Sequence, residues 1–136
     1  MKSSWRRTLG YLWAGPNTAL GLCVVPLTLL TGGRVQQRRG ALEVYGGAAT
    51  FLLRYGTLLK AGASAMTIGH VILGRDVECL DRCRDHEHVH VRQYERWGPF
   101  FLPAYLAASV IAGLRGGDMY RDNAFEVEAY SACPPA

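Results

Sequence analysis

The residues of this chain with the clearest chemical potential are His86 and His90, with Glu87 between them. On an α-helix, residues four apart lie on the same face, so the two imidazoles can bind one metal ion. Zinc binds histidine nitrogen at about 2.0–2.1 Å and suits such a pair. Glu87 can then act as a general base on a metal-bound water. The spacing therefore predicts a Zn²⁺ site with His86 and His90 as ligands and Glu87 as the catalytic carboxylate.

The neighbouring residues predict the helix that this site needs. Asp76 is a good N-cap and Gly98-Pro99 is a stop signal, so we expect a helix over residues 77–97. At about 100° per residue, one broad face of this helix is apolar and contains both histidines of the motif. The same winding puts His88 on the charged face, and we expect it to point to solvent.

Two carboxylates near the C-terminus are expected to face different ways on one short helix. Asn123 can cap this helix, over residues 124–132. Winding it at about 100° per residue puts Glu126 on its apolar arc and Glu128 outside that arc. We therefore expect Glu126 to point into the domain and Glu128 to lie nearer solvent. The alternative is that Glu126 only closes a capping box with Asn123, which would leave it exposed.

The motif His86-Glu87-x-x-His90, followed by Phe125-Glu126-Val127-Glu128-Ala129-Tyr130, resembles the gluzincin zinc peptidases. In that family a downstream Glu on a second helix is the third zinc ligand. The resemblance therefore implies Glu126 as the third ligand here, with Glu128 as the alternative. The resemblance implies a zincin-like domain that hydrolyses peptide bonds in a peptide or protein substrate. The Glu-x-x-Ala ending is similar to membrane-anchored zinc peptidases of the prenyl-protease and heat-shock type.

Two further positions bear on this resemblance: one matches a second family and one differs from the zinc peptidases. Gln93, three residues after His90, is similar to a bacterial family of uncharacterised HExxHxxQ proteins. At the position of Tyr130, the membrane-anchored peptidases carry an Asp that supports a histidine ligand. Two alternatives to a peptidase stay open: a non-catalytic metal-binding membrane protein with a degenerate site, and a small membrane protein whose motif is accidental.

The composition indicates contact with a membrane. Hydrophobic residues make up 49% of the 136 residues and charged residues only 19%. The formal net charge of +4 suits an anionic membrane surface. The sequence has no nucleic-acid-binding motif, so we do not expect a nucleic-acid partner.

The N-terminal part of the chain is the strongest candidate for a membrane segment. Residues 9–31 carry no charge and follow a basic start. About 20 apolar residues cross a bilayer as a helix, so we predict that residues 1–33 form an apolar helical anchor. A signal peptide and a buried core helix are the alternatives. Basic residues flank both ends, so the sequence does not predict an orientation.

Residues 34–136 are predicted to form a single α+β metal-binding domain. Residues 34–38 and 41–45 are typical of a hairpin turning at Arg39-Gly40. Residues 65–73 predict a further strand, which gives a short antiparallel sheet before the motif helix.

Three features of this domain are less specific. Residues 48–60 fit a strand or a short helix, and the uncharged residues 98–114 fit a membrane span, a buried helix or an interfacial helix. We interpret His70, within the third predicted strand, as a structural residue.

Overall fold

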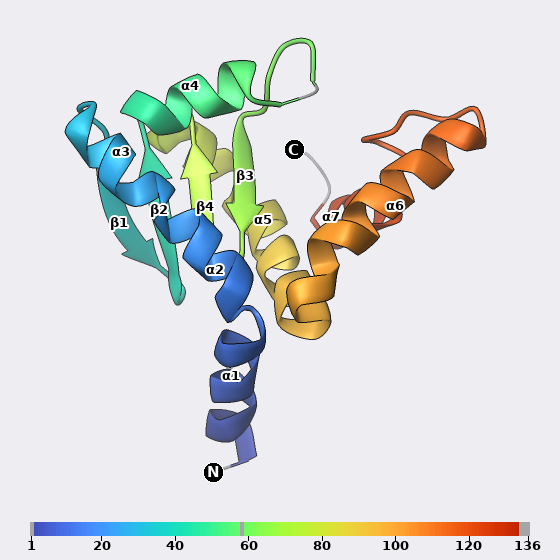
Figure 1. The fold of residues 1–136 in the computed structure, drawn as a ribbon, viewed down its shortest axis with the longest axis horizontal. Coiled ribbons are helices and arrows are strands. Elements are labelled where there is room, and N and C mark those ends of the chain that lie inside the picture. Colours follow the sequence, from blue (N-terminus) through green and yellow to red (C-terminus); the bar gives the residue numbers. More distant parts are fainter. Residues whose placement is uncertain (1, 58, 134–136) are drawn as a thin grey trace.

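A computed structural model describes residues 2–57 and 59–133 of the chain (Figure 1). Helices and strands alternate along the sequence before a C-terminal helical part. The elements are α1 (Lys2–Trp13), α2 (Gly15–Leu22), α3 (Val24–Leu30), β1 (Arg34–Arg38), β2 (Ala41–Tyr45), α4 (Gly47–Tyr55), β3 (Ala65–Ile68), β4 (Val71–Gly74), α5 (Val77–Trp97), the 3₁₀ turn η1 (Gly98–Phe100), α6 (Phe101–Leu114) and α7 (Ala124–Ala132).

The sheet has four strands in the order β1-β2-β4-β3. The pairs β1/β2 and β3/β4 are antiparallel, whereas β2 and β4 run parallel. The predicted α+β class is confirmed, but the sheet is mixed and not purely antiparallel. A parallel pair needs a crossover connection, and here α4 and β3 lie in the chain between β2 and β4.

The two hairpin turns differ in how well the sequence predicted them. Arg39 and Gly40 both have positive φ, 50° and 79°, as a tight two-residue hairpin requires, and the predicted hairpin is confirmed. The single strand predicted over residues 65–73 is wrong. Gly69 adopts φ +65°, a left-handed conformation open to glycine, and turns the chain between β3 and β4.

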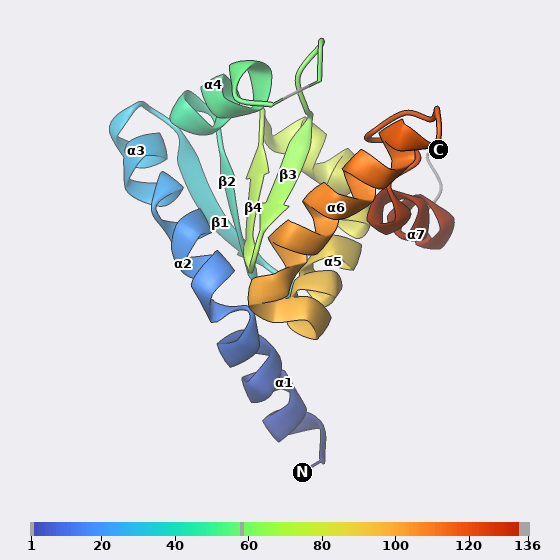
Figure 2. The same cartoon turned by 45° about the vertical axis from the view of Figure 1, so that its right-hand side comes forward.

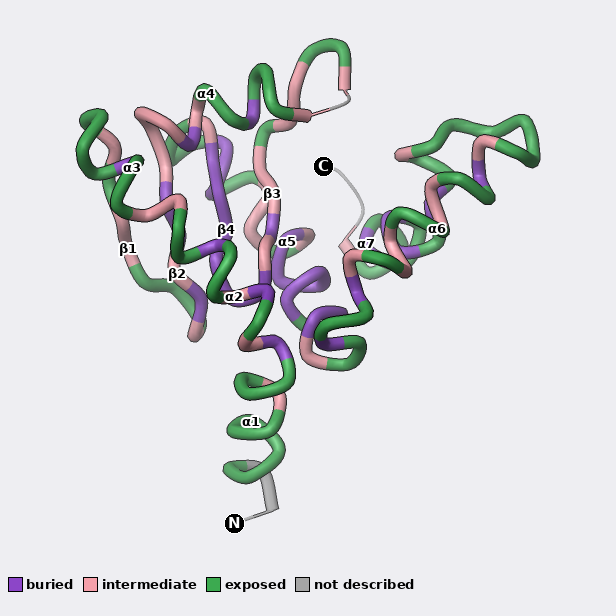
Figure 3. The backbone as a smooth tube through the Cα atoms, in the orientation of Figure 1, coloured by how far each residue is buried: buried purple, intermediate pink, exposed green. Residues whose placement is uncertain are grey.

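Helices cover both faces of the sheet. Figures 1 and 2 show α2 and α3 on one side of it and α5 on the other. Side chains of β4 alternate between these layers: Val71 and Leu73 pack with Leu53 of α4, whereas Ile72 packs with Leu80 of α5. Burial on both faces explains why β4 is buried along its whole length (Figure 3).

The predicted N-terminal apolar helix is not supported. Residues 2–30 fold as the short helices α1, α2 and α3, and the chain bends by 61° between Ser4–Trp13 and Gly15–Leu30. Pro16 lies in the first turn of α2, where its missing N–H is tolerated and where it favours a new helix start. A long straight span is therefore interrupted near its middle.

The N-terminal helices also contact the rest of the fold. Trp13 Nε1 donates to the Arg96 carbonyl at 3.2 Å, and the buried Asn17 amide donates to the Gly98 carbonyl at 2.8 Å. His70, which lies in the β3–β4 turn, stacks on the Tyr11 ring with centroids 4.0 Å apart. The proposed division of the chain at residue 33 stays a prediction.

His70 has further contacts that agree with a structural role. Its Nε2 lies 2.8 Å from a Glu95 carboxylate oxygen, and its backbone N–H donates to the Thr18 hydroxyl at 3.0 Å. These bonds join the β3–β4 turn to α5 and α2.

One continuous helical run, Val77–Leu114, is long and apolar enough to cross a membrane by length and composition. The run consists of α5, η1 and α6, and its apolar part is η1 with α6. Gly98, with φ +55°, marks the change from α5 to this apolar part. In Figures 1 and 2, α6 projects away from the sheet beside α7. Large apolar side chains remain exposed along it: Leu106, Val110, Ile111 and Leu114.

Helix α5 follows the prediction in its limits but not in one of its faces. Asp76 caps it by accepting from the Cys79 N–H at 2.7 Å, and Gly98 ends it. His88, expected in solvent, is buried with 7% exposure. The reason is that the sheet covers this side of α5 too, and burial lowers the pKa of His88.

The same layer contains a buried carboxylate. Glu43 of β2 has no exposed surface and accepts from Arg84 Nε at 2.6 Å and Nη2 at 2.9 Å. Gln36 of β1 donates to it at 2.6 Å. Burial alone would raise the pKa of Glu43, but these donors outweigh burial and lower it.

Candidate metal centre

Helices α5 and α7 bring His86, His90 and Glu126 together. The His86 and His90 Nε2 atoms are 3.2 Å apart, and the Glu126 Oε2 atom lies 3.2 Å from the first and 3.3 Å from the second. Ligands about 2.0–2.1 Å from one tetrahedral ion are separated by about 3.3–3.4 Å. The three atoms thus form one face of a tetrahedron that can hold a metal ion.

Glu126 and Glu128 take different positions, although they are two residues apart on α7. Glu126 is buried against the imidazoles. Glu128 is exposed and pairs with Arg96 at 2.5 Å. The Asn123 side chain caps α7 by accepting from the Phe125 N–H, so the cap does not need Glu126.

Gln93 orients one of the two histidines. It has no exposed surface, and its Oε1 lies 2.8 Å from His90 Nδ1. Its amide nitrogen donates to the Phe125 carbonyl at 3.1 Å, which fixes which end of the amide faces the histidine. In neutral His90 the proton therefore lies on Nδ1, and the Nε2 lone pair can bind a metal. The same amide joins α5 to α7.

Two tyrosines contact the other two candidate ligands, His86 and Glu126. The Tyr130 ring packs over His86 with centroids 4.4 Å apart, and His86 Nδ1 is buried without a hydrogen-bond partner in the described part of the chain. Tyr105 of α6 donates to Glu126 Oε1 at 2.7 Å. Because Oε1 is engaged, Glu126 offers Oε2 alone, and a tetrahedral ion would keep one open position.

His90 and Glu126 each shift the pKa of the other. Burial opposes a charge on His90, but the hydrogen bond with Glu126, the negative charges of Glu87 and Glu126 and the Gln93 contact together outweigh burial and raise the pKa of His90 to about 9. The same bonds from the histidines lower the pKa of Glu126 to about 2. A proton on His90 therefore occupies the position that a metal cation would take.

Metal binding should accordingly compete with this proton. His90 must be neutral to bind a metal, so we expect metal affinity to fall roughly tenfold for each pH unit below 9. Titration of the metal in buffers of different ionisation enthalpy should show about one proton released per ion. An affinity that does not change as the pH falls through neutrality would contradict this competition.

Removing the Gln93 support should weaken the site without destroying it. We expect Gln93→Leu to lower metal affinity by roughly 10–100-fold, because His90 Nδ1 loses its acceptor. Competition against a coloured chelator measures the change. Gln37→Leu, on the exposed β1 strand, is the matched control and should bind as wild type does.

Glu87 follows His86 on α5 and is buried, with 6% of its surface exposed. Burial raises its pKa, while the charges of His90 and His86 oppose that rise. Thr67 of β3 donates to Glu87 Oε2 at 2.7 Å, and Tyr94 of α5 donates to the Thr67 carbonyl at 3.0 Å. These bonds fix the carboxylate beside the three ligand atoms; its role as a base stays a prediction.

Sequence reasoning did not find two of the supporting residues. Thr67 and Tyr105 reach the site across the fold from β3 and α6, and no local pattern marks them. The spacing of Gln93 could have indicated its role, because a residue three positions after His90 lies on the same helical face and can contact it.

These residues come from different elements and meet on one side of α5. No protein-family model matches the chain, and neither a curated protein nor a solved structure does.

Proposed function

We propose that this protein is a zinc-dependent hydrolase that cleaves peptide bonds. The observation that carries the proposal is the triangle of His86, His90 and Glu126 donor atoms with buried Glu87 beside it. Two imidazoles and one carboxylate suit zinc, and three protein ligands with an open position are typical of catalytic zinc sites. The zincin resemblance of the motif agrees with this function but does not carry it.

In this mechanism a bound zinc would lower the pKa of a water molecule and polarise the substrate carbonyl. Glu87 accepts a proton from the attacking water and returns it to the departing amine nitrogen. Its raised pKa favours the first transfer, because a more basic carboxylate takes up the proton of the water more readily. Thr67 keeps the carboxylate oriented during the reaction.

The edge of the sheet supports a peptide as substrate. β3 carries Thr67 beside Glu87, and it is the outermost strand on its side of the sheet. An extended peptide can pair with such an edge through its backbone, which would place a scissile bond near α5.

Glu87→Gln tests this function directly. We expect hydrolysis of an unstructured protein such as casein to fall by roughly 10²–10⁴-fold, because the general base is lost while the metal ligands remain. Metal content should be unchanged. Glu78→Gln, an exposed glutamate on α5, is the matched control. Equal hydrolysis by wild type and Glu87→Gln would leave a non-catalytic metal protein as the better description.

We also propose that the protein works at a membrane. Exposed apolar residues of α6 support this location, as does the apolar composition. The 17 or so residues of η1 and α6 are about 25 Å long, which is shorter than the roughly 30 Å of a bilayer core. Association with the bilayer surface therefore fits the fold better than a span.

A further inference from the structure

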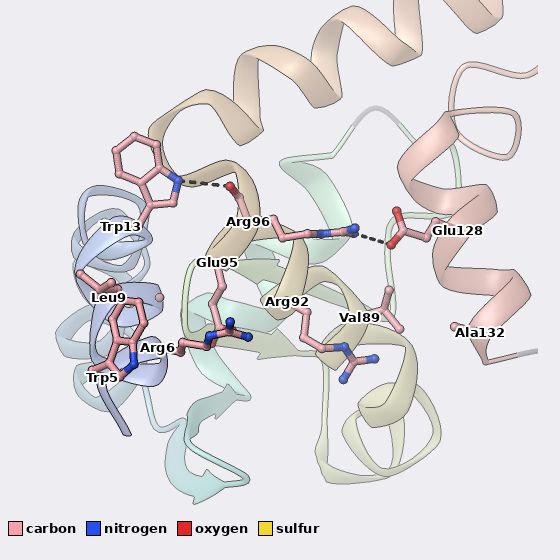
Figure 4. A pocket seen from close by; sticks show the side chains of 11 residues that line it. Trp5, Arg6, Leu9, Trp13, Val89, Arg92, Glu95, Arg96, Glu128 and Ala132 are labelled. Carbon is pink, nitrogen blue, oxygen red and sulfur yellow. Dashed lines mark hydrogen bonds and ion pairs between the residues drawn. The ribbon is translucent and has the colours of Figure 1, made fainter. Parts of the chain in front are cut away.

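A cleft of about 720 Å³ lies between α1, α5 and α7 (Figure 4). The metal ligands do not line it, although it shares two helices with their site. The residues around it are either aromatic and aliphatic or charged, and the two kinds lie mostly on different walls. They are Trp5, Arg6, Leu9, Gly10, Trp13, Val89, Arg92, Glu95, Arg96, Glu128 and Ala132.

The α1 wall is apolar and open to solvent. At about 100° per residue, Trp5, Leu9, Leu12 and Trp13 share an arc of roughly 100° on α1. The apolar arc of an amphipathic helix normally faces the core, but here Leu12 is 70% exposed and Trp5 is 54% exposed. Figure 4 shows Trp5 and Leu9 on α1, on the opposite side of the view from Glu128 and Ala132 of α7. Helix α1 therefore leaves part of its apolar arc exposed to solvent.

Two of the arginines that line the cleft form no ion pair with another lining residue. Arg96 pairs with Glu128, and Glu95 lies 2.8 Å from His70 Nε2. Between the residues that line the cleft, no ion pair engages Arg6 or Arg92 (Figure 4). Arg6 comes from α1 and Arg92 from α5, so each of these two walls carries a guanidinium that forms no ion pair with another residue lining the cleft.

We propose that this cleft binds the headgroup phosphate of an anionic phospholipid while α1 lies in the bilayer interface. Guanidinium groups bind phosphate oxygens through charge-assisted hydrogen bonds, which Arg6 and Arg92 can donate. Trp5, Leu9 and Leu12 would enter the boundary between headgroups and acyl chains. The inference deepens the proposed membrane location and rests on it.

The surroundings of the cleft favour a bilayer over a free anion. Trp13 packs near Phe100 of η1, with ring centroids 6.1 Å apart, and Phe100 is itself exposed. Aromatic side chains with an apolar body prefer the level of lipid headgroups. A free phosphate would use the arginines and leave these aromatic and aliphatic groups in water.

Vesicle binding by the full chain tests the proposal. We would measure co-sedimentation with vesicles of phosphatidylcholine containing phosphatidylglycerol, and with vesicles of phosphatidylcholine alone. Arg92→Gln should lower the partition coefficient for the anionic vesicles about fivefold, the effect of one arginine near a charged surface. Arg54→Gln, on exposed α4 at the other end of the molecule, makes the same charge change and should bind as wild type does.

A second pair of variants tests the apolar wall. Leu9→Asn should lower binding about tenfold, whereas Leu52→Asn on α4 should not. Failure to bind either kind of vesicle would overturn both the membrane location and the cleft. Equal binding to neutral and anionic vesicles, equal losses in Arg92→Gln and Arg54→Gln, or release by inorganic phosphate at the same ionic strength would overturn the lipid cleft alone. None of these outcomes bears on hydrolysis at the metal site.

Discussion

Glu126→Gln is expected to abolish metal binding, whereas Glu128→Gln is expected to leave it intact. The wild-type protein should hold about one zinc per chain after purification and dialysis. Glu126 supplies one corner of the ligand triangle, and a neutral amide oxygen is a much weaker zinc ligand than a carboxylate. The loss should exceed the roughly 10–100-fold that removal of a supporting residue causes.

Glu128→Gln makes the identical chemical change on the same helix, which excludes a general effect on α7. Its carboxylate is exposed and pairs with Arg96. Elemental analysis and chelator competition give the metal content, and circular dichroism shows that both variants fold. Full metal content in Glu126→Gln, or loss in Glu128→Gln, would disprove the assignment of the third ligand.

The second large effect is on stability, at the buried pair of Glu43 and Arg84. We expect Arg84→Met to lower the free energy of unfolding by about 3–5 kcal/mol. The substitution leaves the Glu43 carboxylate buried with Gln36 as its remaining donor. Denaturant unfolding followed by circular dichroism measures the change.

Two controls separate this burial effect from the loss of an ordinary ion pair. The double variant Glu43→Met/Arg84→Met removes both charges and should recover most of the lost stability. Arg39→Met breaks the exposed pair with Asp85, at 2.6 Å, and should change the free energy of unfolding by less than about 1 kcal/mol. A loss in Arg84→Met no larger than in Arg39→Met would show that Glu43 is not held as described.

Acid should reveal the same pair. The pKa of Glu43 is lowered from 4.5 in the folded protein, so its contribution to stability is present above that pH. The contribution is then lost as the pH falls through the lower, folded-state pKa. Arg84→Met removes two of the three hydrogen bonds that lower this pKa, together with the positive charge, so that variant should lack most of this acid sensitivity.

The sequence by itself determined the local parts of the site. The limits of α5 and α7 follow from Asp76, Gly98 and Asn123, which act within a few residues of themselves. The spacing of the motif predicted that its two histidines share a helical face. The winding of α7 distinguished Glu126 from Glu128. Caps and helical periodicity depend on neighbours in the chain, so a single sequence contains them.

Tertiary structure decided the features that depend on what packs against an element. Residues 9–31 have the composition of a span, but bends and contacts such as that of Asn17 with Gly98 make them part of the fold. His88 has the helical phase of a surface residue, yet the sheet covers it. Hydropathy describes how apolar a segment is, but it does not show whether the segment packs against lipid or against the rest of the protein.

The ligand triangle itself required the whole fold. Two helices separated by α6 must meet so that Glu126 reaches the histidines to within 3.3 Å. Gln93 sets that meeting by binding His90 and the α7 backbone, and Tyr105 turns one Glu126 oxygen toward the imidazoles. Such contacts join residues far apart in the chain, where no spacing rule applies. The sequence therefore predicted which residues can bind a metal, and only their packing could bring them within the reach of one ion.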